Sequence, residues 1–168
     1  PLEGVEMGTR CGSIDPAIVT YIMKKYGYTP DEMSNFMNKK CGFLGVSGIS
    51  SDSRDIEAAI LNGDKRAKTA AFTLAYQIKK YIGSYAAAMN GLDAVLFTGG
   101  IGENATDVRE KVCADMDFFG IKIDNALNAE IHGKLQKIST PDSKVEVWVV
   151  PTNEELLIAR DTLALISE

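Results

Sequence analysis

The sequence is poor in the residues that form disulfide frameworks and metal centres, with three cysteines and one histidine among 168 residues. Cys11, Cys41 and Cys113 lie far apart, and none has a second cysteine or histidine at the spacing of a metal site. An odd number of separated cysteines is typical of reduced thiols in a cytosolic protein. We therefore expect a core that forms without disulfides or a structural metal.

The sequence also lacks an excess of positive charge and any long apolar run. Its 18 Lys and Arg residues stand against 23 Asp and Glu residues, which gives a formal net charge of −5. Proteins that bind nucleic acid or anionic membranes usually carry a basic patch or stripe. No apolar run reaches the roughly 18 residues of a membrane span, and no signal peptide is visible. We predict a cytoplasmic protein that binds neither nucleic acid nor membrane.

What is present is ordinary for one soluble globular domain. Hydrophobic residues make up 45% of the chain and charged residues 24%, and no repeat or flexible linker divides it. The first residues are Pro-Leu-Glu-Gly, without an initiator methionine. We therefore expect a single domain over residues 1–168 that is a piece of a longer protein.

Helix signals dominate the first half of the chain. Asp15 before Pro16 predicts a capped helix that ends at Gly27. Thr29 and Glu32 predict a capping box for a second helix that ends near residue 41. Two further helices are predicted over 55–61 and 65–89, with a glycine- and serine-rich loop over 42–51.

In the second half, short apolar runs alternate with helical patterns. Strands are predicted over 93–97, 121–123 and 145–150, and helices over 107–114 and 125–131. Thr152 and Glu155 predict a capping box for a last helix. The residues expected on or near the buried face of that helix are Leu156, Ile158, Ala159, Leu163 and Ile166. This alternation predicts an α/β domain with helices packed on a partly parallel sheet.

The segment most informative about function runs from Leu96 to Asn104 (LFTGGIGEN), where a predicted buried strand leads into three glycines. Glycines let the backbone approach a ligand closely, and exposed amides at a helix N-terminus favour phosphate. No Lys-Ser/Thr pair follows at the spacing of a Walker A loop. The segment therefore indicates either a nucleotide-binding turn or a plain tight turn between a strand and a helix.

A dinucleotide-binding fingerprint is a competing interpretation of the same glycines. Gly100, Gly102 and Ala105 match its spacing, and Asp124 follows a short predicted strand. Against this, too few residues follow Asp124 for the rest of a doubly wound domain, and a long helix before the turn is unusual for one. A fragment of a dinucleotide-dependent oxidoreductase remains an alternative at this point.

Two arginine-containing segments are further candidates. Arg10 lies between glycines ahead of a capped helix, where its guanidinium could fold over an anionic oxygen cluster. It could equally be a loop residue that pairs with solvent or with Asp15. Asp52, Ser53 and Arg54 could hydrogen-bond a ligand, although a helix N-cap with charges on its first turn explains them as well.

Acidic residues near the last helix and the single histidine are weaker candidates. Glu154 and Glu155 suit the first turn of a helix because of its dipole. A carboxylate at the mouth of a strand-to-helix connection could also hold Mg²⁺ through water. His132 has no nucleophile motif nearby, so we expect a solvated or helix-end side chain.

Four segments, taken together, resemble the acetate kinases and with them the similar propionate kinases. They are PLEGVEMGTRCGSIDP at 1–16, GVSGISSDSRD at 45–55, FTGGIGENATDVRE at 97–110 and VPTNEELLIARDT at 150–162. The resemblance implies a ribonuclease-H-like α/β domain of the acetate and sugar kinase/Hsp70/actin superfamily, with helical insertions over about 16–42. It also implies that the chain is the C-terminal, nucleotide-binding half of a two-domain kinase.

The same resemblance implies roles for individual residues. Arg10 matches the arginine that stabilises the transferring phosphoryl group, and Glu154 matches the metal-associated glutamate. The residues that match the adenosine-phosphate turn are Gly100, Ile101, Gly102, Glu103 and Asn104. The residues that match those bordering adenine and ribose are Asp52, Ser53 and Arg54.

The reaction implied for the complete protein is the reversible in-line transfer of the γ-phosphoryl group of ATP to acetate, with Mg²⁺ as the metal. The products are acetyl phosphate and ADP. By resemblance, the complete protein is a homodimer joined through this domain, and the helix over 65–89 is part of that surface. The fragment alone is expected to bind nucleotide without catalysing transfer. A propionate kinase and a stand-alone nucleotide-binding module are the alternatives.

Overall fold

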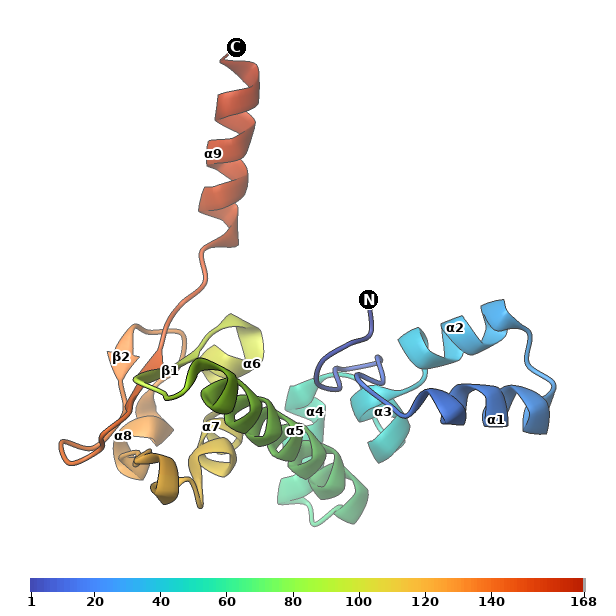
Figure 1. Cartoon of the computed structure of the whole chain (residues 1–168), viewed down its shortest axis with the longest axis horizontal. Helices are drawn as coiled ribbons and strands as arrows, with labels where there is room; N and C mark the ends of the chain where they lie inside the picture. The colour runs from blue at the N-terminus through green and yellow to red at the C-terminus, as the bar shows by residue number, and fades with distance from the viewer. Residues whose placement is uncertain (168) are drawn as a thin grey trace. The chain divides into compact units, whose positions relative to one another are not determined.

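The computed structural model describes residues 1–167, apart from the side chain of Glu154. The chain divides into two compact units, Pro1–Asn90 and Gly91–Glu168. The first unit is helical and the second is built on a small sheet (Figure 1). The prediction of a mixed α/β chain is confirmed.

The helices of the first unit are α1 (Pro16–Tyr26), α2 (Pro30–Lys39), α3 (Gly42–Ser47), α4 (Ser53–Leu61) and α5 (Lys65–Met89). The caps predicted for α1 and α2 are present. The Asp15 side chain accepts a hydrogen bond from the Ala17 amide, and Thr29 and Glu32 form both bonds of a capping box. The long helix α5 ends at Asn90, which adopts the left-handed conformation typical of a helix C-cap.

The loop predicted over 42–51 is wrong in part, because its first six residues form α3. Gly42 has a φ of +60°, and a β-carbon there would lie 1.9 Å from the Met7 carbonyl oxygen. The absence of a side chain at Gly42 therefore allows two backbone segments to approach each other closely. Phe43 is buried and α3 packs against α5, so burial outweighs the low helix propensity of a glycine-rich stretch.

The core of the first unit is built on alanines of α5. Small side chains at helical spacing let neighbouring helices approach α5 closely, and α3 and α4 both pack against it. The buried residues of α5 are Ala67, Ala70, Ala71, Leu74, Ala75 and Ala86. Larger buried side chains are contributed by Met33, Phe43 and Ile56.

The second unit contains β1 (Ala94–Phe97), α6 (Gly99–Asn104), α7 (Thr106–Cys113), a short 3-10 turn η1 (Asp117–Phe119), α8 (Asn125–Glu130), β2 (Gln136–Lys137), β3 (Glu146–Val149) and α9 (Glu154–Ile166). The strand order is β1-β3-β2. β1 pairs parallel to β3, with Phe97 opposite Val149, and β2 pairs antiparallel to β3. The strand predicted over 121–123 is reduced to two isolated bridges.

The last helix differs from its prediction in two ways. Its N-cap is Asn153, whose side chain accepts from the Leu156 amide, and the predicted Thr152–Glu155 capping box is absent. Every residue from 155 to 166 is exposed, so the predicted buried face is wrong within this structure. None of the helices among the described residues is long and apolar enough to cross a membrane.

One acidic side chain is buried in the first unit without a charged partner. Glu6 is 4% exposed, and its Oε1 has no hydrogen-bond partner among the described residues. Its backbone amide donates to the Gln77 Oε1 of α5 at 2.7 Å. Burial raises the pKa of Glu6 from 4.5 to about 7.

This raised pKa predicts that Glu6 destabilises the fold as the pH rises. The unfolded chain releases the Glu6 proton near pH 4.5 and the folded chain near pH 7, so the favourable contribution is complete below 4.5 and is lost by about 7. Between pH 4.5 and pH 8, the free energy of unfolding of Glu6→Gln should improve relative to wild type by up to about 3 kcal/mol. Urea unfolding at several pH values measures this difference. Glu3→Gln, at an exposed carboxylate of the same segment, is the control, and a pH-independent difference for Glu6→Gln would contradict the prediction.

Candidate functional site

The glycines predicted to carry function lie directly after β1. Thr98 is extended, Gly99 has a φ of +70°, and Gly99–Asn104 form the short helix α6. The expected arrangement was a glycine loop followed by a single helix over 107–114, and the structure instead has two helices with Ala105 between them. The turn closes on itself because the Asn104 side chain donates to the Gly100 carbonyl at 3.0 Å.

Two of these glycines differ in their surroundings. A β-carbon at Gly100 would meet no atom within 4 Å, so the backbone there faces open space. A β-carbon at Gly102 would lie 3.1 Å from the Phe97 carbonyl carbon at the end of β1. The backbone at Gly100 is therefore open to a ligand, whereas Gly102 packs closely against the end of β1.

Glu103 and Thr152 join α6 to the segment that follows β3. The Glu103 Oε1 accepts from the Thr152 amide at 2.9 Å, and this bond lowers the pKa of Glu103. The Thr152 hydroxyl lies 2.6 Å from that of Thr98 and accepts from the Gly99 amide at 3.0 Å. Thr152 was missed as a site residue, although the carboxyl ends of adjacent parallel strands meet at one sheet edge.

Arg109 of α7 is the second residue that sequence reasoning missed. It is fully buried and donates to the Gly102 carbonyl of α6 at 2.9 Å. Its remaining bonds go to the Asn128 side chain at 2.7 Å and to the carbonyls of Asn128 and Ile131. Burial lowers the pKa of Arg109. Its spacing of three and four residues from the apolar Val112 and Cys113 of the same predicted helix is the signal that could have found it.

The candidates of the first unit include the start of α4. Asp52 is the N-cap of α4 and accepts from the Arg54 amide at 2.9 Å. The Arg54 guanidinium donates to both carboxylate oxygens of Asp52. These hydrogen bonds lower the pKa of Asp52 to about 2. Ser53 is the first residue of α4, so the segment has the geometry expected of an N-cap with charges on its first turn.

Arg10 lies in a loop that the backbone holds tightly. The Arg10 carbonyl accepts from Met7, and the Ser13 amide donates to the Gly4 carbonyl. The Arg10 side chain is exposed, and across residues 1–167 its guanidinium makes no hydrogen bond or ion pair. Asp15 instead caps α1. The alternative in which Arg10 pairs with Asp15 is therefore wrong in this structure.

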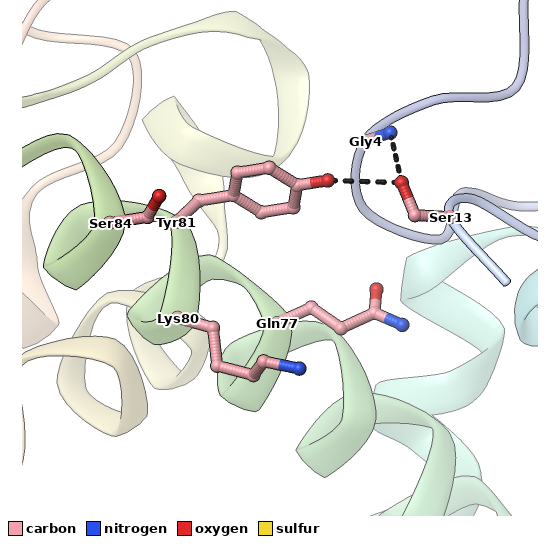
Figure 2. A pocket seen from close by; sticks show the side chains of 6 residues that line it. All are labelled: Gly4, Ser13, Gln77, Lys80, Tyr81 and Ser84. Atoms are coloured by element: carbon pink, nitrogen blue, oxygen red, sulfur yellow. Dashed lines mark hydrogen bonds between the residues drawn. The ribbon is translucent and has the colours of Figure 1, made fainter. Parts of the chain in front are cut away.

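An open pocket lies beside this loop within the first unit (Figure 2). The Ser13 hydroxyl, bound to the Gly4 amide and to the Tyr81 hydroxyl at 3.0 Å, connects the loop to α5. Lys80 and Gln77 of α5 complete its polar lining. None of the predicted site residues lines this pocket.

The predicted site residues are thus divided between the units. Arg10 and the start of α4 belong to the first unit, and the α6 glycines belong to the second.

Within the described part of the chain, no group of three or more Asp, Glu, His or Cys residues could hold a metal ion. Glu154, the predicted metal residue, begins α9 but its side chain lies outside the described part. Asp124, the acidic residue of the dinucleotide interpretation, caps α8 by accepting from the Leu127 amide at 3.0 Å.

Known proteins match this chain along nearly its whole length. The sequence matches the Acetokinase family over residues 1–160. The acetate kinase of Moorella thermoacetica is 55% identical over 166 residues, which are 99% of this chain and 42% of the relative. The acetate kinase of Bacteroides thetaiotaomicron is 55% identical over 168 residues, which are 100% of this chain and 42% of the relative.

Solved structures give the same result. The crystal structure of Porphyromonas gingivalis acetate kinase matches with a TM-score of 0.93 at 52% identity, over 99% of this chain and 42% of that one. A propionate kinase from Francisella tularensis matches with a TM-score of 0.87 at 38% identity, over 95% of this chain and 40% of that one. The chain therefore spans about two fifths of the length of these relatives. Since sequence and fold agree across nearly every residue, the chain belongs to the acetokinase family.

Proposed function

We propose that this chain is the nucleotide-binding part of a kinase that transfers the γ-phosphoryl group of ATP to acetate. The observation that carries the proposal is the α6 turn at the end of β1. Its backbone is open at Gly100 in a chain that matches the Acetokinase family over residues 1–160. In this proposal, Gly100, Ile101, Gly102, Glu103 and Asn104 bind the adenosine phosphates. A dinucleotide-dependent oxidoreductase is disfavoured by the same family match.

The start of α4 is proposed to border adenine and ribose. With a pKa of about 2, Asp52 is a carboxylate at neutral pH, able to accept hydrogen bonds from hydroxyl groups. Arg54 is 87% exposed, and its guanidinium is held in place by Asp52. A planar guanidinium with free faces can stack on an aromatic base. Ser53 adds a hydroxyl beside them.

The proposed chemistry is a direct in-line displacement. A carboxylate oxygen of acetate forms a bond to the γ-phosphorus while the bond to the bridging oxygen of ADP breaks, which yields acetyl phosphate and ADP. Charge on the transferring group spreads over three equatorial oxygens. The role proposed for Arg10 is to donate hydrogen bonds to those oxygens, because its guanidinium is exposed and carries no partner in residues 1–167.

Mg²⁺ is the metal proposed to accompany ATP, with Glu154 beside it. The described side chains alone do not form a metal site, so no step of the transfer is assigned to the ion. Acetate is proposed as the substrate, and the likeness to a propionate kinase makes propionate the second candidate. Comparing the two acids as substrates of the complete protein distinguishes these candidates.

A cytoplasmic homodimer joined through this domain is also proposed for the complete protein. Three aromatic side chains of α5, Phe72, Tyr76 and Tyr85, are 54–62% exposed. Exposed aromatic residues of this kind are enriched at protein interfaces. Sedimentation equilibrium of the complete protein tests the dimer.

Nucleotide binding should depend on open backbone at Gly100. Gly100→Val adds a side chain into open space, so it should reduce ATP affinity by roughly 10-fold or more without lowering the thermal unfolding midpoint. Gly102→Ala should lower that midpoint, because its β-carbon would crowd Phe97. Calorimetric ATP titration and thermal unfolding of the chain measure both effects. Equal ATP affinity in wild type and Gly100→Val would refute the assignment of α6.

The chain alone should not catalyse transfer at a rate resembling that of the complete enzyme. It spans 42% of its acetate kinase relatives, and catalytic groups must be held within hydrogen-bonding distance to give most of the acceleration. The measurement is acetate-dependent ADP formation by purified residues 1–168, with the complete Moorella thermoacetica acetate kinase as a positive control. Robust turnover by the chain would overturn this expectation.

Arg10 should affect turnover much more than substrate binding. In the complete two-domain protein, Arg10→Ala should lower kcat by roughly 10³-fold, by analogy with arginine fingers, because the charge that it stabilises develops mainly in the transition state. Arg10→Lys should recover little, since an ammonium group lacks the two-pronged geometry. Lys25→Ala, at an exposed cation of α1, is the control. A kcat for Arg10→Ala within about threefold of wild type would show that Arg10 is only a loop residue.

A further inference from the structure

We propose that Arg109 is the positioning residue of the nucleotide turn. It holds α6, through the Gly102 carbonyl, in the geometry that receives the phosphates of ATP. This role rests on the proposed nucleotide function. It does not require Arg109 to touch the ligand, since the side chain is fully buried.

The first argument is the chemistry of its burial. A buried charge is costly unless it is paired or fully hydrogen-bonded, and an apolar side chain of similar volume would often fill such a place with equal or greater stability. Arg109 has no carboxylate among its hydrogen-bond partners in residues 1–167. It donates to four neutral oxygens, at Gly102, Ile131 and twice at Asn128.

The second argument is that α6 is anchored at its C-terminal end by one short segment and by Arg109. The Gly133 amide donates to the Glu103 carbonyl at 3.1 Å, and the His132 Nδ1 lies 3.1 Å from the Asn104 carbonyl. Arg109 binds the remaining carbonyl, that of Gly102, and also the Ile131 carbonyl at 2.7 Å. Among the described residues, Arg109 is therefore the one side chain that hydrogen-bonds to the backbones of both α6 and this segment.

The third argument is local charge. The nearest carboxylate on α7, Asp107, is paired with Lys111 at 2.6 Å. Asp107 acts on Arg109 without a hydrogen bond to it, so among the described residues the guanidinium has no bonded counter-ion next to α6. A cation without a bonded counter-ion in a low-dielectric interior acts over a longer range than one in water. Its sign complements a polyphosphate.

The fourth argument is the need for a guanidinium. The four acceptors bind three different nitrogens of Arg109, Nε, Nη1 and Nη2. A lysine would keep the charge but has a single nitrogen on a flexible stem. Asn128 belongs to the same hydrogen-bond network, because its Nδ2 donates to the Thr106 carbonyl while its Oδ1 accepts from Arg109.

The test compares binding of ATP, ADP and adenosine to the 168-residue chain by calorimetry. Arg109→Met should weaken ATP and ADP binding by roughly 10-fold or more while adenosine affinity changes less than about twofold. Arg109→Lys should restore part of the loss. Lys68→Met removes an exposed cation of α5 and should leave all three affinities unchanged. Thermal unfolding of each variant verifies that it is folded.

Asn128→Ala keeps the test decisive if Arg109→Met does not fold. It removes one acceptor of Arg109 and retains the charge, so it should weaken ATP binding by about threefold with adenosine unaffected. Unchanged ATP affinity in folded Arg109→Met and in Asn128→Ala, or an equal loss for ATP and adenosine, would overturn the positioning role alone. Failure of the wild-type chain to bind ATP would instead overturn the proposed function and this role with it.

Discussion

The parallel pairing of β1 with β3 is the constraint on which the candidate site depends. Because the two strands run in the same direction and Phe97 is opposite Val149, the chain leaves both strands at the same edge of the sheet. Thr98 and Thr152 meet there with their hydroxyls 2.6 Å apart. The Gly99 amide binds the Thr152 hydroxyl, so the start of α6 is defined by a strand far away in sequence.

The two ends of α6 are held by different kinds of interaction. At the N-terminal end, the Gly99 amide donates to the Thr152 hydroxyl, whereas a buried cation, Arg109, binds the Gly102 carbonyl. Gly102 also packs closely against Phe97, which restricts the movement of α6 relative to β1. Between these anchors, the backbone at Gly100 is left open. Rigid ends and an open centre suit a turn that must offer its backbone to a ligand without rearranging.

Sequence patterns were reliable where a local interaction decides the structure. Helix starts at Asp15 and Thr29 were predicted correctly because their caps bond to amides two or three residues away. The long helix over 65–89 was predicted correctly because its apolar spacing is sustained over many turns. Glycine content, in contrast, misled the prediction over 42–51. There Gly42 leaves room for the Met7 carbonyl, and local sequence does not reveal this contact.

Predictions that depended on a distant partner were the ones that failed. Thr152 carries the spacing of a capping box with Glu155, but its hydroxyl is committed to Thr98 and Gly99, so Asn153 caps α9 instead. Arg109 went unnoticed because a charged residue in a helix is usually assumed to face solvent. Its burial depends on acceptors at Asn128 and Ile131 that only the fold brings within reach.

The three arginines proposed to take part in function differ in how their charge is compensated, and this difference supports the separate role proposed for each. Arg54 is paired with Asp52 at 2.5 Å, which suits the flat stacking surface proposed for it better than a contact that needs net charge. Arg10 is exposed and unpaired within residues 1–167, so its charge and donors are available to an oxyanion. Arg109 is buried and hydrogen-bonded to neutral oxygens, so the role proposed for it is to hold the backbone of α6. The roles proposed for one residue type are thus a stacking surface, a contact to developing charge and an internal support, because the surroundings of each guanidinium differ.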